Sequence, residues 1–119
     1  MKVFFNGAVV GNLTVILAAL AVAGSAFAAA PVDEEAAKVT ARGSGCFKCH
    51  SVQKKGDGPA YKDVAAKYRG KPGAEEKLVF HITSGEKAKF EDGHEEEHKI
   101  VKTKDMNEIK NLVNWILSQ

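Results

Sequence analysis

The chain is poor in cysteine, proline and tryptophan, and this scarcity restricts what it can be. Of its 119 residues, two are cysteine, three are proline and one is tryptophan. Both cysteines belong to the motif Cys46-Phe47-Lys48-Cys49-His50, so there is no second pair to complete a four-ligand zinc site. Cysteines three residues apart also make a poor structural disulfide. A dithiol redox motif would need a βαβ context, and no strand pattern surrounds the pair.

The sequence has no excess of charge of one sign. It holds 17 lysine and arginine residues and 15 acidic residues, a formal net charge of +2 at pH 7. This balance does not suggest a nucleic-acid partner.

No segment of useful length alternates between apolar and polar residues as a strand does, and no internal repeat is visible. These features favour an all-α fold.

The most informative segment is the C-x-x-C-H motif, which is typical of covalent haem attachment. On a helical turn, positions i, i+3 and i+4 share one face, so Cys46 and Cys49 can both form thioether bonds to one haem edge. His50 follows on that face and can give the iron an imidazole ligand. The motif therefore predicts one haem c, bound through Cys46 and Cys49, with His50 as an axial ligand.

The first 28 residues have the pattern of an export signal. Lys2 is the only charge before Asp33, an apolar run follows it, and Ala26-Phe27-Ala28 is an A-x-A cleavage pattern. We expect residues 1–28 to be removed and residues 29–119 to form one domain with a modest core. A retained membrane anchor is the alternative, because the uncharged stretch is nearly long enough to span a bilayer. Export favours a periplasmic location, where haem attachment of this kind takes place in bacteria.

Four helices are predicted from end signals and periodicity, over residues 33–42, 60–68, 74–84 and 105–117. The last has a buried stripe at i, i+3, i+4 and i+7, flanked by Trp115 and formed by Ile109, Leu112, Val113 and Ile116. The first has a thin apolar face whose small residues would let another helix approach closely, made of Ala36, Val39 and Gly43.

With these features in place, the chain resembles the small bacterial class I cytochromes c over nearly all of the mature domain. The likeness is carried by Gly45 to His50, Gly58-Pro59-Ala60-Tyr61-Lys62-Asp63-Val64-Ala65-Ala66-Lys67-Tyr68, Gly73-Ala74-Glu75 and Trp115-Ile116-Leu117-Ser118. The resemblance implies four to five short helices around one haem, with the first and last helices crossing near Gly43 and Trp115. It also implies that the Pro59 carbonyl accepts the proximal histidine's other N–H, which fixes its tautomer.

The chain departs from this family on the far side of the iron. Family members usually supply a methionine there, from a Met-Pro loop between the last two helices. The corresponding loop, Lys89 to Ile100, contains neither methionine nor proline. Met106 is the only methionine of the mature segment, and its place in the first turn of the last helix indicates a helix-start or packing role.

Two histidines occupy the region where the ligand is missing. Counting back from Trp115 places the usual ligand position at or beside His98, whereas counting forward from Gly85 places it beside His94. Spacing leaves both open, and we expect His98 to be the sixth ligand, with His94 as the alternative. A solvated position is the ordinary expectation for a histidine in an acidic loop, and the run Glu95-Glu96-Glu97 is itself expected to be solvated.

The remaining basic residues allow two further expectations. His81 lies in the helix before this loop, where family members often carry a basic residue facing a haem propionate; surface exposure is the alternative. Four lysines are expected to form a docking rim around the haem edge, namely Lys48, Lys54, Lys55 and Lys62.

The sequence as a whole predicts a periplasmic, monomeric, monohaem c-type cytochrome that carries one electron between larger redox proteins. It predicts no catalytic residues, because the haem iron does the chemistry. Bis-histidine ligation would give a low reduction potential, since imidazole favours ferrous iron less than a thioether does. One alternative is a gas-binding or sensing haem protein with a labile sixth ligand. Another is a haem subunit of a larger oxidoreductase complex. We expect no membrane span after signal cleavage.

Overall fold

The computed structural model describes residues 31–119, so the expected export signal at residues 1–28 lies outside the described part. The elements in chain order are α1 (Glu34–Gly43), a short 3₁₀ helix η1 (Cys46–Lys48), α2 (Tyr61–Tyr68), α3 (Ala74–Ser84), β1 (Lys87–Lys89), β2 (Glu95–Glu97) and α4 (Met106–Leu117). The four predicted helices are confirmed, each to within one residue at its ends. Between residues 31 and 119, no helix has the length and apolar character needed to cross a bilayer.

Aspartates cap the first and last helices. The Asp33 carboxylate accepts the Ala36 N–H at 3.0 Å, and the Asp105 carboxylate accepts the Asn107 N–H at 2.8 Å. The start of α1 is also tied to α4, because the Asp33 N–H and carbonyl each make a 2.8 Å hydrogen bond with the Asn111 side chain. These bonds fix where α1 begins relative to α4.

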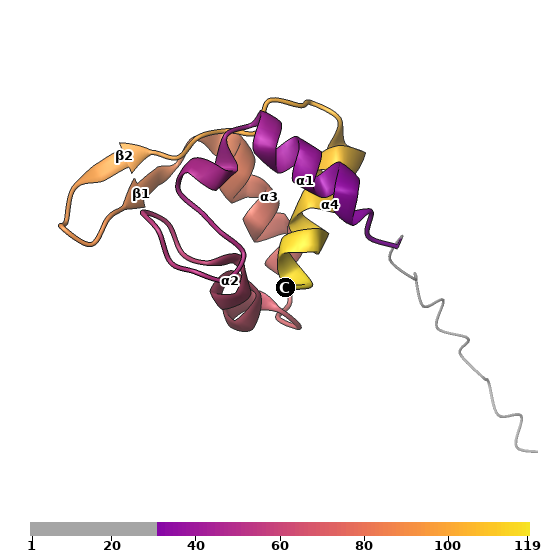
Figure 1. Cartoon of the computed structure of the whole chain (residues 1–119), viewed down its shortest axis with the longest axis horizontal. Helices are drawn as coiled ribbons and strands as arrows, with labels where there is room; N and C mark the ends of the chain where they lie inside the picture. Colours follow the sequence, from indigo (N-terminus) through magenta and orange to yellow (C-terminus); the bar gives the residue numbers. More distant parts are fainter. Residues whose placement is uncertain (1–30) are drawn as a thin grey trace, which may run out of the picture.

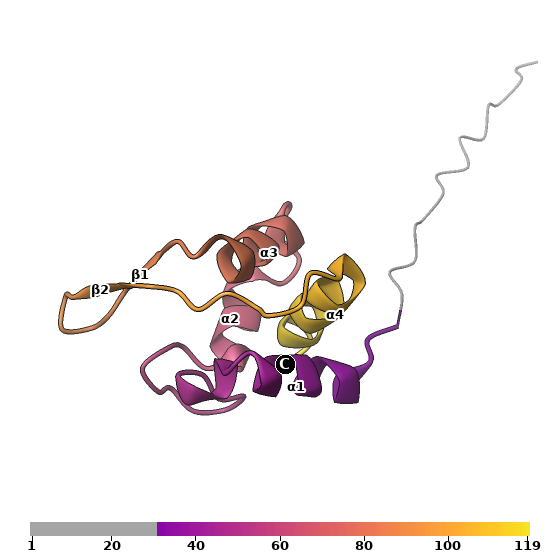
Figure 2. The same cartoon turned by 90° about the horizontal axis from the view of Figure 1, so that it is seen from above.

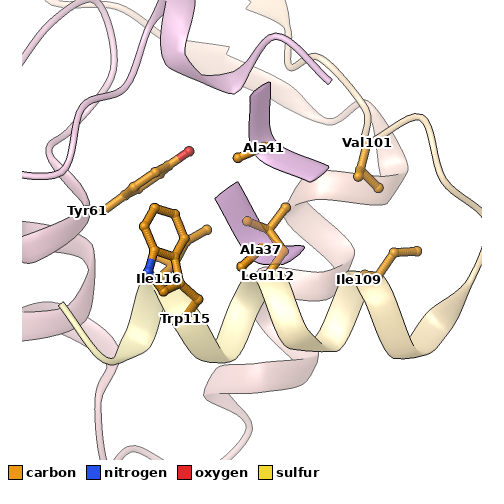
Figure 3. Close-up of a cluster of buried hydrophobic side chains, with 8 residues drawn as sticks. All are labelled: Ala37, Ala41, Tyr61, Val101, Ile109, Leu112, Trp115 and Ile116. Atoms are coloured by element: carbon orange, nitrogen blue, oxygen red, sulfur yellow. The ribbon is translucent and has the colours of Figure 1, made fainter. Parts of the chain in front are cut away.

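The central helix is α4, which packs against α1, α2 and α3 (Figures 1 and 2). Its predicted stripe is confirmed as buried, and Trp115, at 2% exposure, belongs to the core itself rather than to its flank. Figure 3 shows the core cluster between α1 and α4, with Tyr61 of α2 against Trp115; its members are Ala37, Ala41, Tyr61, Val101, Ile109, Leu112, Trp115 and Ile116.

The face of α1 that meets this core is not the predicted one. Ala37 and Ala41 are fully buried, whereas Ala36 is exposed and Val39 is 62% exposed. An added Cβ at Gly43 would meet nothing within 4 Å, so α4 does not approach closely there. The prediction was wrong because small residues lie on two faces of this helix. The large side chains of α4 pack onto the alanine methyl groups instead.

An antiparallel hairpin of β1 and β2 interrupts the helical fold, although the sequence predicted no strand. Lys87 lies opposite Glu97 and Lys89 lies opposite Glu95. Opposite charges that face each other across two strands stabilise the pairing, so the hairpin forms without apolar alternation. In both overall views it projects beyond the helices (Figures 1 and 2). The fold remains that of a helical domain, with this one small sheet.

The segment after the hairpin, residues 98–102, is held against the helices by three backbone N–H groups. They donate from His98 to the Glu86 carbonyl at 3.0 Å, from Val101 to the Ile82 carbonyl at 2.8 Å, and from Lys102 to the Ser44 hydroxyl at 3.1 Å. Val101 is buried between these points. The segment therefore has a fixed position between the end of α3 and the end of α1.

Glu75 links α3 to α4 and provides a test of this packing. Its carboxylate accepts the Asn114 side-chain N–H at 2.9 Å and lies 3.0 Å from the Lys110 ammonium. These contacts, Asn114 first, hold the pKa of Glu75 below its ordinary value. A depressed folded pKa means that the carboxylate stabilises the fold above its unfolded pKa, and that this stability is lost as pH falls through the folded pKa.

We expect Glu75→Gln to lower the free energy of unfolding by about 1 kcal/mol at neutral pH, because the ion pair is partly exposed. The difference from wild type should shrink as the pH falls through the folded pKa of Glu75, and denaturant unfolding at two pH values measures it. Glu76→Gln, one position along the same turn, is the matched control. An equal loss of stability at both pH values would show that packing, and not charge, is responsible.

Candidate functional site

Cys46, Cys49 and His50 lie on one tight turn directly after α1. Cys49 and His50 donate their backbone N–H groups to the Cys46 carbonyl at 3.2 and 3.0 Å, which holds the three residues within a single helical turn. Both thiols are free and half-buried. Burial raises the pKa of the Cys46 thiol, which keeps it protonated in the protein without its cofactor.

His50 is oriented by the loop that follows it. Its Nδ1–H donates to the Pro59 carbonyl at 2.8 Å. Because a carbonyl can only accept, this bond places the proton on Nδ1 and leaves the Nε2 lone pair free for a metal. Tyr61 stacks on the ring, with centroids 5.3 Å apart and planes 16° apart. Gly58 leaves room for the ring, since an added Cβ would lie 2.5 Å from its Cε1 atom.

Backbone hydrogen bonds hold this loop at both ends. The Gly58 N–H donates to the Cys49 carbonyl at 2.9 Å, and the Tyr61 N–H donates to the Ser51 carbonyl at 2.9 Å. Pro59 lies between the two bonds and has no N–H of its own to satisfy. The position of its carbonyl opposite His50 is therefore a property of the loop.

The structure brings His98 to His50. The centroids of the two rings are 6.0 Å apart. The Nδ1 atom of His98 is buried and has no hydrogen-bond partner among the described residues. Burial lowers the pKa of His98 to about 4, with smaller contributions from His81 and His50. The ring is therefore neutral at pH 7, which is the form that binds metals.

His94 lies at the end of the hairpin, between β1 and β2. Phe90 stacks on its ring with centroids 4.3 Å apart, and its Nδ1 atom pairs with the Asp92 carboxylate. That carboxylate raises the pKa of His94 and so favours the imidazolium form, which is a poor metal ligand. The neighbouring Glu95–Glu97 strand is exposed, as its sequence predicted. Within residues 31–119, no group of three His, Cys, Asp or Glu side chains is arranged to hold a metal ion.

His81 lies beside His98, with ring centroids 4.0 Å apart. Its Nδ1 atom is 2.5 Å from a carboxylate oxygen of Glu86. Sequence reasoning missed this partner, which comes within reach because Gly85, at φ +70°, ends α3 in a left-handed conformation. Met106, the other residue considered as a ligand, begins α4 and is 48% exposed.

These residues fit a covalently bound haem. Two free thiols lie one helical turn apart, and one histidine has its Nε2 atom free. A second, neutral histidine has a buried ring nitrogen without a partner among the described residues. Gly58 keeps the ring of the first histidine unobstructed. Fold and site together define a helical c-type haem protein.

Comparisons with known proteins give the same class. The family model described as Cytochrome c matches residues 33–119. Cytochrome c-551 of Allochromatium vinosum is 44% identical over 79 residues, which cover 66% of this chain and 81% of that protein. Cytochrome c-551 of Pseudomonas aeruginosa is 48% identical over 48 residues, which cover 40% of this chain and 46% of that protein.

Solved structures are similar over most of their length. The crystal structure of the class 1 cytochrome MtoD from Sideroxydans lithotrophicus ES-1 has 64% identity and a TM-score of 0.71, over 74% of this chain and 97% of that one. The crystal structure of cytochrome c552 from Nitrosomonas europaea has 31% identity and a TM-score of 0.55, over 68% of this chain and 96% of that one. The chain therefore belongs to the cytochrome c family. It is a small class I, monohaem electron carrier with one haem c bound through Cys46 and Cys49.

Proposed function

We propose that this protein is a periplasmic electron carrier whose haem iron is held by His50 and His98. The separation of 6.0 Å between the centroids of the two rings carries the proposal. A first-row metal ion binds an imidazole nitrogen at about 2 Å, and the ring centre lies about 1 Å further away, so two imidazoles on opposite sides of one ion have centres about 6 Å apart. The observed spacing agrees with this value and so supports the proposal of a bis-histidine pair.

The fold itself holds His98 at this position. Its backbone N–H donates to the Glu86 carbonyl, and the buried Val101 anchors the chain three residues later. The haem would supply one-electron chemistry when bound, and His50 and His98 would be the two residues that hold its iron. An electron carrier needs no vacant coordination position, whereas a gas-binding protein does, so a firmly placed His98 supports the carrier role.

The proposed ligands set the reduction potential. A thioether favours ferrous iron, so a second imidazole in its place should give a lower potential than that of methionine-ligated relatives. The glutamates of β2 are exposed, and their charges are therefore screened by water and salt, so we expect them to contribute little to the potential. The second ligand is the main determinant of the difference.

The periplasmic location rests on the export pattern in residues 1–28, which agrees with the attachment of haem c outside the cytoplasm. The partners that we propose are larger redox proteins, one as donor and one as acceptor. The carrier between them is proposed to be a monomer, because it has to dock with each in turn.

Optical spectra of the purified wild-type protein test the ligand assignment. We expect a low-spin ferric spectrum without the weak near-infrared band of an iron–methionine bond, and a ferrous form that does not bind carbon monoxide. A redox titration should give a potential below that of a methionine-ligated relative measured under the same conditions. The near-infrared band would overturn the assignment of His98, and a high-spin ferric spectrum would contradict a firmly bound second imidazole.

A further inference from the structure

The two proposed iron ligands are held in different ways. The His50 ring has a hydrogen bond to the Pro59 carbonyl and a stacked Tyr61. The His98 ring has no such bond, because its buried Nδ1 atom is without a hydrogen-bond partner among the described residues. Histidines that bind a metal usually donate the N–H of their other ring nitrogen to an acceptor, which fixes the plane of the ring. The orientation of the His98 ring must therefore come from another contact.

That contact is the ring of His81. The centroids of the His81 and His98 rings are 4.0 Å apart and their planes are 44° apart. Two rings at this separation are in van der Waals contact, so neither can turn freely without moving the other. His81 belongs to the last turn of α3, so the His98 ring rests on a residue of a regular helix.

The side chain of Glu86 fixes the ring of His81. The two are joined by a contact of 2.5 Å between Nδ1 and a carboxylate oxygen, in which the ring N–H donates and the carboxylate accepts. Glu86 can reach back to α3 because Gly85, with φ +70°, reverses the chain at the end of the helix. The Glu86 N–H donates to the Ser84 hydroxyl at 3.1 Å. The position of the carboxylate is thus set by the end of α3.

Glu86 also holds the backbone of His98. Its carbonyl accepts the His98 N–H at 3.0 Å, at the base of the hairpin where Lys87 lies opposite Glu97. In Figures 1 and 2 the chain leaves α3 for β1 and returns from β2 beside it. Glu86 therefore acts on His98 at two points. Its carbonyl holds the main chain, and its carboxylate, through His81, holds the ring.

We propose that His81 and Glu86 are positioning residues for the sixth ligand. The Glu86 carboxylate holds His81, and His81 keeps the imidazole plane of His98 in the orientation that binds the iron. The proposal rests on the bis-histidine ligation proposed above. A ligand whose ring is fixed stays on the iron in both oxidation states, which suits a protein that only passes an electron on.

Displacement of His98 by cyanide in the ferric holoprotein tests the proposal. At saturating cyanide and fixed pH, the observed rate equals the rate at which His98 leaves the iron. We expect Glu86→Ala, which keeps the backbone carbonyl, to raise this rate by roughly 3- to 10-fold, as expected for the loss of one partly exposed hydrogen bond. His81→Ala should raise it at least as much, because the ring contact is lost too. Glu86→Gln should restore a rate near that of wild type, since an amide oxygen can still accept from His81.

Electron paramagnetic resonance gives a readout that a purely stabilising role would not change. The largest g value of a low-spin ferric haem with two imidazole ligands depends on the angle between the planes of their rings. The planes of His50 and His98 are 51° apart. We expect His81→Ala to shift or broaden this signal. Thermal unfolding of the same samples checks that each variant is folded.

The matched control is Glu96→Ala. It removes an exposed carboxylate of β2 two residues before His98, at a position that lies opposite Ala88 and not opposite a lysine. We expect wild-type displacement rates and g values from it. Equal acceleration in Glu96→Ala and Glu86→Ala would overturn the proposal, because negative charge near the ligand would then be responsible.

The other outcomes are equally distinct. Wild-type rates and g values in both His81→Ala and Glu86→Ala would show that the His98 ring needs no support from α3. An effect of His81→Ala without any effect of Glu86→Ala would contradict the role of Glu86 and favour a contact between His81 and a haem propionate. An iron–methionine band in the near-infrared spectrum of the wild type would instead contradict the ligation by His98 on which the proposal rests.

Discussion

Replacing His98 with alanine should convert the ferric protein from low-spin to high-spin and open the iron to added imidazole and to carbon monoxide. The reason is the position of the His98 ring, whose centroid lies 6.0 Å from the centroid of the His50 ring. The backbone N–H of His98 donates to the Glu86 carbonyl and so holds the residue there. Without the imidazole, residues 98–102 keep their anchors at Val101 and Lys102, so the fold should survive. Absorption and electron paramagnetic resonance spectra measure the change.

His94→Ala is the matched control, because it removes the other histidine that spacing allowed. His94 is exposed and paired with Asp92 at the end of the hairpin, so we expect its removal to leave the haem spectrum unchanged. The reverse pattern would move the assignment to His94. If neither single change alters the spin state, the His94→Ala/His98→Ala double variant is measured. Low-spin iron in that variant would exclude both histidines as the sixth ligand and make Met106 the remaining candidate.

The second large effect is expected from Gly58→Ala. An added Cβ would lie 2.5 Å from Cε1 and 2.8 Å from Nδ1 of the His50 ring, well inside van der Waals contact. The ring would have to move, and its 2.8 Å bond to the Pro59 carbonyl would be lost. We expect a lower yield of holoprotein, a weakened bond from His50 to the iron, and a loss of about 2–3 kcal/mol in the free energy of unfolding.

Gly43→Ala is the control for this change, since a methyl group there meets nothing within 4 Å and Gly43 lies within α1. It should leave the spectrum unchanged and should not destabilise the protein, because alanine is the better helix former. Thermal unfolding followed in the Soret band compares the two variants. A Gly58→Ala protein with a wild-type spectrum and midpoint would show that the loop can shift without moving His50.

The helices were predictable because each carries its own end signals. Asp33 and Asp105 cap α1 and α4, and Gly85 ends α3 with a positive φ. These are local interactions, and local sequence reports them well. The C-x-x-C-H motif is local in the same way, since five consecutive residues place both thiols and His50 on one turn.

The hairpin was not predictable by the same reasoning. Its strands read Lys-Ala-Lys and Glu-Glu-Glu and have no apolar face, so their pairing depends on charges that meet only after the chain has turned. The hairpin also separates the two candidate sixth ligands, because His94 lies in the connection between its strands and His98 directly follows β2. Counting residues along the sequence could not reveal this difference in position. The burial of Ala37 and Ala41 likewise depends on α4, which is distant in sequence.

The lone tryptophan gives the molecule a built-in optical reporter. Trp115 is buried against Tyr61 and lies 6.4 Å, ring centre to ring centre, from Phe47, which sits between the two haem-bearing cysteines. A haem attached there absorbs strongly at the wavelengths where indole emits. The tryptophan fluorescence of the folded protein should therefore be almost completely quenched. Emission would appear only when α4 separates from α1 and α2. The light from one residue therefore reports the distance between the last helix and the cofactor during folding.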